Sequence, residues 1–210
     1  MDGTQRCGQG QTHDHFAANP WEPGERRLTF HLTLEASPAI HDAAVRVHEA
    51  LADQPAARPV PVPWLHLTMT GFGRSGEVPD EARAEISERV FAVWDRFARE
   101  RILYDRLFIA EESGMLLARD DPWLPDLAAV QRAAVTTVLG ERTWGRLWPH
   151  TSLSYLTGAI RAELLASRLE GVADGLPDVI EAAPTLTLME LGRDTGNYEW
   201  RTIRYAGPAL

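Results

Sequence analysis

The sequence contains no lysine: all 21 of its basic residues are arginine. A lysine side chain supplies the amine of a protein Schiff base, the nitrogen that covalent ligases adenylate and the phosphate-binding ammonium of a P-loop. None of these three chemistries is open to this chain. Any chemistry that it performs must therefore rely on other side chains.

Cysteine and long apolar runs are also scarce. Cys7 is the only cysteine, so no intrachain disulfide can form and nothing points to an oxidising compartment. The N-terminal stretch lacks the basic start and the apolar run of a signal peptide. No segment approaches the roughly 18 apolar residues that a membrane-spanning helix needs. We therefore expect a cytoplasmic protein that does not interact with a membrane.

Basic residues are fewer than acidic residues in this chain. The 210 residues carry 30 acidic and 21 basic side chains, which gives a formal net charge of −9. A protein that grips long nucleic acid needs a basic surface to neutralise many phosphates, so we expect no extended grip of that kind. A cleft that handles one phosphate at a time is compatible with this charge.

Length and composition indicate one globular unit. Apolar residues make up 44% of the chain and charged residues 24%, as in ordinary folded domains. Residues 1–25 are rich in Gly, Gln, His, Pro and Asn without periodicity, which predicts a flexible N-terminal tail. We expect residues 26–210 to form a single bilobal domain, and we expect a monomer.

Strands and helices are predicted in mixed order. Alternating patterns predict strands near 26–35, 64–72, 102–110, 115–118, 147–156, 185–191 and 198–205. Helical periodicity and capping residues predict helices near 37–54, 79–99, 121–139 and 159–169. Hairpins and helices alternate without a regular βαβ rhythm, which indicates an α+β fold with antiparallel sheet.

Two of the predicted strands carry the same motif, a histidine followed two positions later by a hydroxyl residue. The motifs are His66-Leu67-Thr68 and His150-Thr151-Ser152, 84 positions apart. Because side chains alternate across a strand, the imidazole and the hydroxyl of each motif share a face and can reach one small anion. Two such motifs facing each other would place an acid and a base on opposite sides of one phosphate.

The sequences that flank these motifs separate them from a chance match. The tripeptide alone is weak, because His31-Leu32-Thr33 also fits it. However, a proline-rich stretch ending in Trp64 precedes His66, Gly71-Phe72-Gly73 follows its strand, and Trp148-Pro149 precedes His150. In these flanks, residues 26–206 resemble the 2H phosphoesterase superfamily, which includes bacterial 2′-5′ RNA ligase-like enzymes and cyclic phosphodiesterases.

The resemblance implies a bilobal α+β fold. Two antiparallel sheets with flanking helices would be related by a pseudo-twofold axis around a central cleft. His66 and His150 would be the catalytic pair, and Thr68 and Ser152 would bind the phosphate oxygens. Enzymes of this superfamily hydrolyse 2′,3′-cyclic phosphates or related cyclic phosphodiesters without a metal, so the resemblance implies no cofactor. The implied partner is a cyclic nucleotide or the 2′,3′-cyclic phosphate end of an RNA.

The residues suit this chemistry. In-line attack on a phosphodiester needs a base for the water, an acid for the departing alkoxide and donors for the remaining oxygens. We assign His150 as the base and His66 as the acid. Two alternatives stay open. One is the 2′-5′ joining of RNA ends, to which an acidic chain is less suited; the other is a non-catalytic nucleotide- or RNA-end-binding module, which would need neither histidine.

Several aromatic residues near the motifs are candidate contacts of a substrate. Phe72, Trp148 and Tyr155 could stack on a base, and His31 could line the cleft; for each, burial in the protein core is the alternative. His13 and His15 flank Asp14, but they lack a third ligand on a rigid frame, so we expect no metal site there.

Two arginines lie close to the motifs in the sequence. Arg74 and Arg146 could offer a guanidinium fork to a second phosphate, although we expect both to be solvated at the surface. Many 2H enzymes carry a basic residue just after the second motif, where this chain has Ser154-Tyr155-Leu156. This departure argues against recognition of a polyphosphate or an RNA strand from that position and leaves the chemistry at one phosphodiester unaffected.

Overall fold

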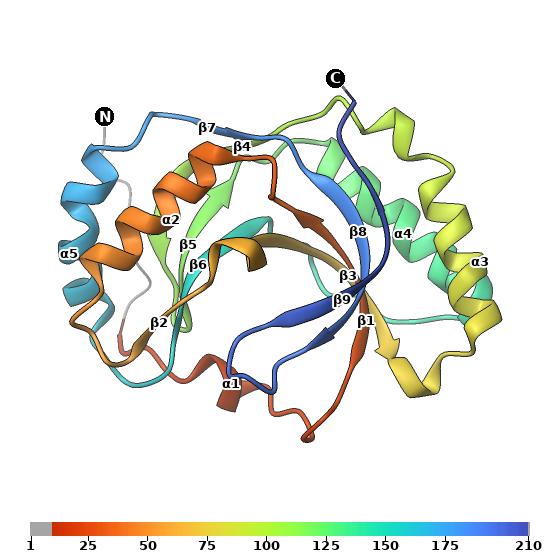
Figure 1. Ribbon diagram of the computed structural model, residues 1–210, viewed down its shortest axis with the longest axis horizontal. Coiled ribbons are helices and arrows are strands. Elements are labelled where there is room, and N and C mark those ends of the chain that lie inside the picture. Colours follow the sequence, from red (N-terminus) through yellow and green to blue (C-terminus); the bar gives the residue numbers. More distant parts are fainter. Residues whose placement is uncertain (1–9, 210) are drawn as a thin grey trace.

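The computed structural model describes residues 10–209, in which nine strands form one antiparallel sheet (Figure 1). The strands are β1 (Arg27–Thr33), β2 (Ala57–Pro59), β3 (His66–Arg74), β4 (Ile102–Ile109), β5 (Ser113–Ala118), β6 (His150–Leu156), β7 (Ile180–Ala182), β8 (Thr185–Gly192) and β9 (Glu199–Ala206). Their order across the sheet is β7-β4-β5-β6-β3-β1-β8-β9, and β2 pairs with β6 beside this path. The antiparallel α+β class expected from the sequence is confirmed.

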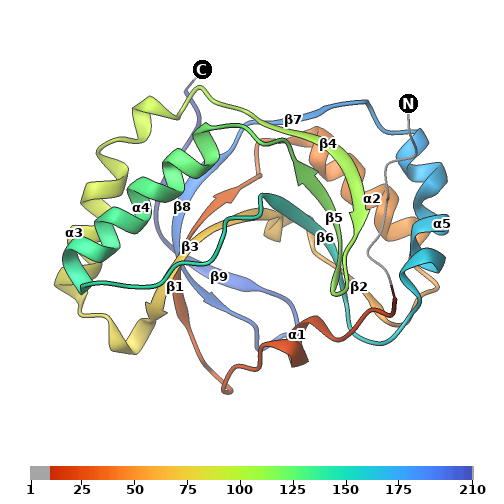
Figure 2. The same ribbon diagram turned by 180° about the vertical axis from the view of Figure 1, so that it is seen from behind.

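The described residues form five α-helices, and the four longer ones flank the two ends of this sheet in pairs. The five helices are α1 (His15–Ala18), α2 (Pro38–Ala50), α3 (Asp80–Phe91), α4 (Trp123–Leu139) and α5 (Ala162–Asp174). Figures 1 and 2 show α2 beside α5 at one end of the molecule and α3 beside α4 at the other. Within residues 10–209, no helix combines the length and the apolar character that crossing a bilayer requires.

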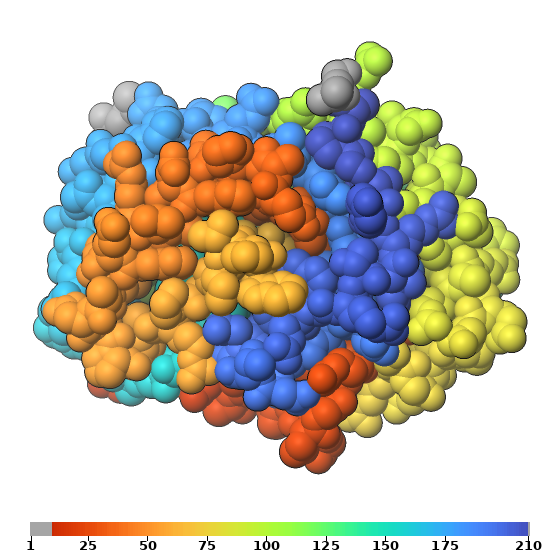
Figure 3. All heavy atoms as spheres, viewed as in Figure 1, coloured from red at the N-terminus to blue at the C-terminus, as the bar shows by residue number. Residues whose placement is uncertain are grey.

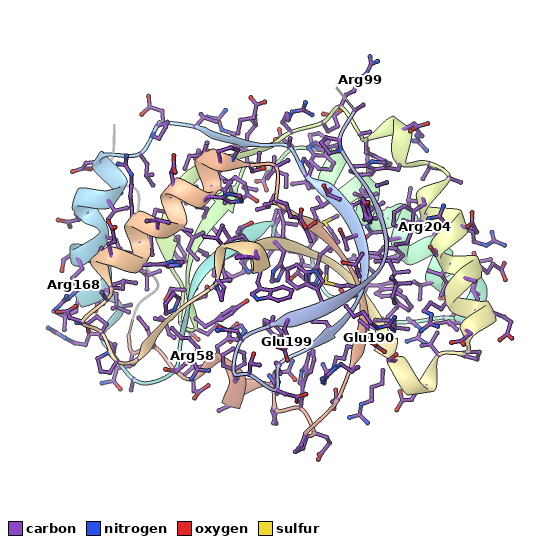
Figure 4. The ribbon with its side chains drawn as sticks, viewed as in Figure 1. Arg58, Arg99, Arg168, Glu190, Glu199 and Arg204 are labelled. Carbon is purple, nitrogen blue, oxygen red and sulfur yellow. The ribbon has the colours of Figure 1, made fainter. Side chains whose placement is uncertain are left out.

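The two halves of the sheet meet at one residue pair. Leu67 on β3 pairs with Thr151 on β6 in antiparallel orientation. Outward from this junction lie β1, β8 and β9 on one side, and β5, β4 and β7 on the other. The two sheets expected from the resemblance are therefore joined into one. Arg58 on β2 also connects the halves, because its guanidinium donates to the carbonyl of Gly196 between β8 and β9 (Figure 4).

Local sequence explains several element boundaries. Pro38 stands at the first turn of α2, where its missing N–H costs no hydrogen bond. At the end of α4, Gly140 takes a φ of +86°, a conformation that glycine adopts without strain. The strand β1 differs from the half-buried strand that alternation predicts, because Thr29, His31 and Thr33 on its polar face are all buried.

The chain before β1 packs against the body of the protein. Residues 1–9 of the expected flexible tail lie outside the described residues, but residues 10–25 make specific contacts. The backbone N–H of Thr12 donates to the carbonyl of Ile160 over 2.8 Å, and that of His13 donates to Glu111 over 2.8 Å. Asp14 caps α1 by accepting from the N–H groups of its first turn. Composition alone favours a tail because it carries no information about these long-range partners.

One face of the molecule is closed by segments from both halves. In Figure 3, α2 in orange, the gold segment that follows β2 and the blue β8–β9 hairpin cover this face. The aromatic rings of Trp64, from the segment after β2, and Trp200, from β9, contact each other within this cover, with centroids 4.6 Å apart. The strands that carry both histidine motifs lie in the middle of the sheet, with other strands on both sides.

Candidate active site

The β3–β6 junction brings the two histidine motifs together. Leu67 and Thr151 are the middle residues of the motifs and are fully buried. Because side chains alternate along a strand, the residues on either side of this pair project from the opposite face of the sheet. The antiparallel register therefore sets His66 across from Ser152 and Thr68 across from His150. Each imidazole has the hydroxyl of the other motif as its cross-strand neighbour.

Both imidazoles are anchored in the same way. Nδ1 of His66 lies 2.7 Å from the carbonyl oxygen of Trp64, and Nδ1 of His150 lies 2.8 Å from that of Trp148. A carbonyl can only accept a hydrogen bond, so each Nδ1 carries the proton. In the neutral ring Nε2 then bears a lone pair, which can take a proton from a reactant. The protonated ring can return that proton from the same atom.

The two hydroxyl residues have different surroundings. Thr68 is exposed and lines a cavity together with His150. Ser152 is half-buried, and its Oγ accepts a hydrogen bond of 2.8 Å from the hydroxyl of Ser113. The proton of Ser152 is thereby left free for another acceptor, such as a phosphate oxygen. Ser113 was not among the residues singled out from the sequence.

Burial favours the neutral form of both histidines. His66 is 9% exposed, and this desolvation, reinforced by the charges of His150 and His15, lowers its pKa to about 4. Desolvation also lowers the pKa of His150, but its hydrogen bond to Trp148 and the charge of Glu112 act in the opposite direction. The electrostatic interaction between His66 and His150 is consistent with two rings that share one site.

A third histidine reaches this site from the N-terminal segment. Nδ1 of His15 lies 3.5 Å from a carboxylate oxygen of Glu112, and this contact lowers the pKa of Glu112. The charge of His15 acts on both motif histidines. The sequence pattern places His15 in a flexible tail, because nothing local indicates that it packs beside residues from strands far along the chain.

His31 on β1, the strand next to β3, packs against the ring of His66. The two rings are stacked with centroids 4.3 Å apart and planes 9° apart. His31 is 1% exposed, neither of its ring nitrogens has a hydrogen-bond partner, and desolvation followed by the charge of His66 lowers its pKa well below the ordinary value. His31 supports the His66 ring from behind, and its burial argues against the predicted role of lining the cleft.

The three aromatic candidates fall into two groups. Phe72 is 2% exposed and packs on Phe30, and Tyr155 is 2% exposed and stacks on His15 at 4.5 Å, so neither offers a free face to a base. Trp148 is 51% exposed, and its ring lies 5.0 Å from that of His150. Of the three, Trp148 is the one that a ligand at His150 can reach.

A further aromatic ring borders His66. Trp200 on β9 meets it edge-on at 5.4 Å. Nothing in the local sequence distinguishes Trp200, because it stands in a C-terminal strand without either motif. Only the pairing of β9 with β8, and of β8 with β1, brings it to this position.

The residues 10–209 contain no group of three or more His, Cys, Asp or Glu side chains arranged to hold a metal ion. His13 and His15 instead face the carboxylates of Glu111 and Glu112 at 3.5 to 3.8 Å. Both histidines thus contribute to the contacts that hold the N-terminal segment against the β4–β5 turn.

Comparison with known proteins found no matching protein-family model and no matching curated protein. Solved structures do share the fold. E. coli LigT bound to 3′-AMP is 17% identical with a TM-score of 0.59, covering 89% of this chain and 99% of LigT. A structure described as a phosphoesterase is 17% identical with a TM-score of 0.56, covering 88% of this chain and 99% of the other. The protein TT0787 of Thermus thermophilus is 17% identical with a TM-score of 0.59, covering 86% of this chain and 97% of that protein.

These similarities span nearly the whole length of each matched structure, so they describe the complete fold and not a shared fragment. The chain therefore has the α+β fold of LigT, of TT0787 and of the structure described as a phosphoesterase.

Proposed function

We propose that this chain is a metal-independent phosphodiesterase that hydrolyses a 2′,3′-cyclic phosphate, on an RNA end or a small nucleotide, to a phosphomonoester. The observation that carries the proposal is the pair of Nδ1-anchored imidazoles, each beside a hydroxyl residue, around the Leu67–Thr151 junction. A nucleotide ligand is consistent with the fold, since structures of E. coli LigT contain 3′-AMP, ATP or phosphate.

The reaction needs only the imidazoles and hydroxyls that the two histidine motifs supply. One Nε2 takes a proton from water, the water oxygen attacks phosphorus, and the bond from phosphorus to one ribose oxygen breaks. The other imidazole, protonated, donates its proton to that departing oxygen. The hydroxyls of Thr68 and Ser152 donate to the two remaining phosphate oxygens, where negative charge is concentrated.

The electrostatics favour one order of roles. His66 is deeply buried and holds its proton weakly, with a pKa of about 4, so it serves as the base. His150 is more exposed and the carboxylate of Glu112 stabilises its protonated form, so it serves as the acid. This order is the reverse of the one that we assigned from the sequence, where burial could not be judged.

Turnover of 2′,3′-cyclic AMP in excess EDTA tests the proposal. We expect the wild-type protein to release a nucleoside monophosphate under these conditions, and His66→Ala and His150→Ala each to lower kcat by about 100-fold or more. His41→Gln is the matched control, because His41 lies on α2, away from the junction, where its Nε2 contacts the carbonyl of Leu34. Full activity of either motif variant, or dependence on a metal, would overturn the mechanism. Binding without turnover would favour the non-catalytic module.

A further inference from the structure

A cavity of about 490 Å³ extends from the candidate site along β3. His150 and Thr68 line it together with the rest of β3 up to Gly73, the segment 142–148 and Arg132 of α4. Figure 2 shows this segment leaving α4 and passing across β3 before it enters β6. A ligand whose phosphate lies between the two histidines can therefore continue into this cavity.

Three arginines line the cavity and no acidic residue does. Arg132 is fixed in place because its Nη2 donates to the carbonyl of Gly145 over 2.9 Å, while its buried Nε has no partner. Arg142 and Arg146 are exposed, and neither forms an ion pair within the described part of the chain. In a chain with a net charge of −9, three guanidinium groups without a carboxylate form an unusual concentration of positive charge.

Several other arginines of the protein form ion pairs with carboxylates. Arg74, the second arginine noted near the motifs, pairs with Glu25 at 3.3 Å and with Glu77 at 3.7 Å. A second cavity, of about 620 Å³, also has three arginines, but Glu100, Asp121 and Asp126 line it as well. The lining of the cavity beside His150 thus contains arginines and no acidic residue, whereas that of the second cavity contains both. Arg132 and Arg146 also line an adjoining cavity of about 410 Å³, where Asp120 and Asp121 are present.

Aromatic rings complete the lining. Trp144 and Trp148 both line the cavity, and the guanidinium of Arg132 lies 5.8 Å from the Trp144 ring. Trp144 is partly buried against the core, whereas the exposed indole of Trp148 can hold a nucleobase by stacking while the guanidinium groups bind phosphate. The cavity thus offers the two kinds of contact that a nucleotide requires.

We propose that this cavity is a subsite for a second phosphate of the substrate, the one attached to the 5′ oxygen of the nucleotide whose cyclic phosphate is cleaved. The proposal rests on the proposed function and narrows its substrate class, because an unsubstituted cyclic mononucleotide would leave the arginines unused. The substrate is then an RNA end, or a cyclic nucleotide that carries a 5′-phosphate. Arg142 and Arg146 supply the charge that the position after the second motif lacks.

Binding of product-like ligands tests the subsite independently of catalysis. Affinities for adenosine 2′-monophosphate and adenosine 2′,5′-bisphosphate are measured by calorimetry. We expect the wild-type protein to bind the bisphosphate at least about tenfold more tightly, and Arg142→Gln and Arg146→Gln each to reduce this preference several-fold. Arg99→Gln is the matched control, since Arg99 lies at the far edge of the molecule (Figure 4). The subsite would be overturned if the wild-type protein bound both ligands with equal affinity. It would also be overturned if a variant with both Arg142→Gln and Arg146→Gln kept the full preference for the bisphosphate.

The two sources of the second phosphate are separated by activity. The substrates are 2′,3′-cyclic AMP, its 5′-phosphorylated form and a dinucleotide that ends in a 2′,3′-cyclic phosphate. A higher kcat/KM for both phosphate-bearing substrates supports the subsite, and a higher value for the dinucleotide alone identifies an RNA end as its source. No preference for either contradicts the proposal. If none is cleaved while the bisphosphate preference persists, the hydrolytic function fails and the subsite stands.

Discussion

Leu67 and Thr151 face each other across β3 and β6 and belong to different histidine motifs. Both are fully buried, and Oγ1 of Thr151 lies 2.7 Å from the hydroxyl of Tyr104 on β4. The junction that aligns the two imidazoles is thus secured by a hydrogen bond within the core. Stability and site geometry depend on the same pair of strands.

Replacing Thr151 with valine keeps the side-chain shape and removes this hydrogen bond. The buried hydroxyl of Tyr104 then has no partner, and we expect the free energy of unfolding to fall by about 1–3 kcal/mol. Adding Tyr104→Phe removes the orphaned hydroxyl and should recover part of that loss. Urea unfolding of both single variants and the double variant measures the coupling; strictly additive effects would contradict it.

The stack of His31 on His66 predicts a positioning effect. His31→Ala removes the ring that supports His66, so we expect a lower kcat for cyclic phosphate hydrolysis with little change in KM. His31→Phe retains a flat aromatic ring and should restore part of kcat. Steady-state kinetics of the two variants provide the measurement. Equal losses in both would show that the stack itself does not matter.

Acid should destabilise the protein through His66. Its pKa falls from the ordinary 6.5 to about 4 on folding, so between these values the unfolded chain binds a proton that the folded chain does not. Stability is therefore highest above pH 6.5 and decreases as the pH falls toward 4, by up to about 3 kcal/mol from this group. Urea unfolding of wild-type and His66→Gln proteins at several pH values tests this. Identical pH slopes would rule out His66 as the cause.

Trp148 and Phe72 should respond differently to substitution. Trp148 is 51% exposed beside His150, so Trp148→Ala should raise KM for a cyclic nucleotide about 5- to 100-fold through lost stacking and leave stability almost unchanged. Phe72→Leu alters a buried ring and should lower the melting temperature without raising KM. The pair is compared by kinetics and thermal unfolding. A higher KM in the Phe72 variant and an unchanged KM in the Trp148 variant would show that the nucleobase does not bind at Trp148.

The N-terminal segment should influence the titration of the site. His15 lowers the pKa of both motif histidines, so His15→Ala should raise both values toward 6.5. Titration of the imidazole protons by NMR follows each ring. His13→Ala is the control, because His13 is more exposed and its ring faces the carboxylates of Glu111 and Glu112. Unchanged titration of His66 and His150 in the His15 variant would show that the segment does not act on the site.

Much of the architecture could be predicted from local patterns. Alternation predicts β1, β3, β6, β8 and β9, and the proline and glycine signals place the start of α2 and the end of α4 within a few residues. The three-residue strands β2 and β7 are not predicted, because so short a segment shows no measurable period. The same alternation predicts that His66 and Thr68 share a face, and that His150 and Ser152 do.

The chemistry-bearing residue types and their local geometry are thus set by the chain itself, since backbone dihedrals fix the direction of neighbouring side chains. Only the tertiary structure decided that Leu67 meets Thr151, that His31 is buried behind His66 and that His15 approaches from residues 10–25. Such contacts join positions far apart in the sequence. They depend on the packing of the whole sheet, which a local pattern does not encode.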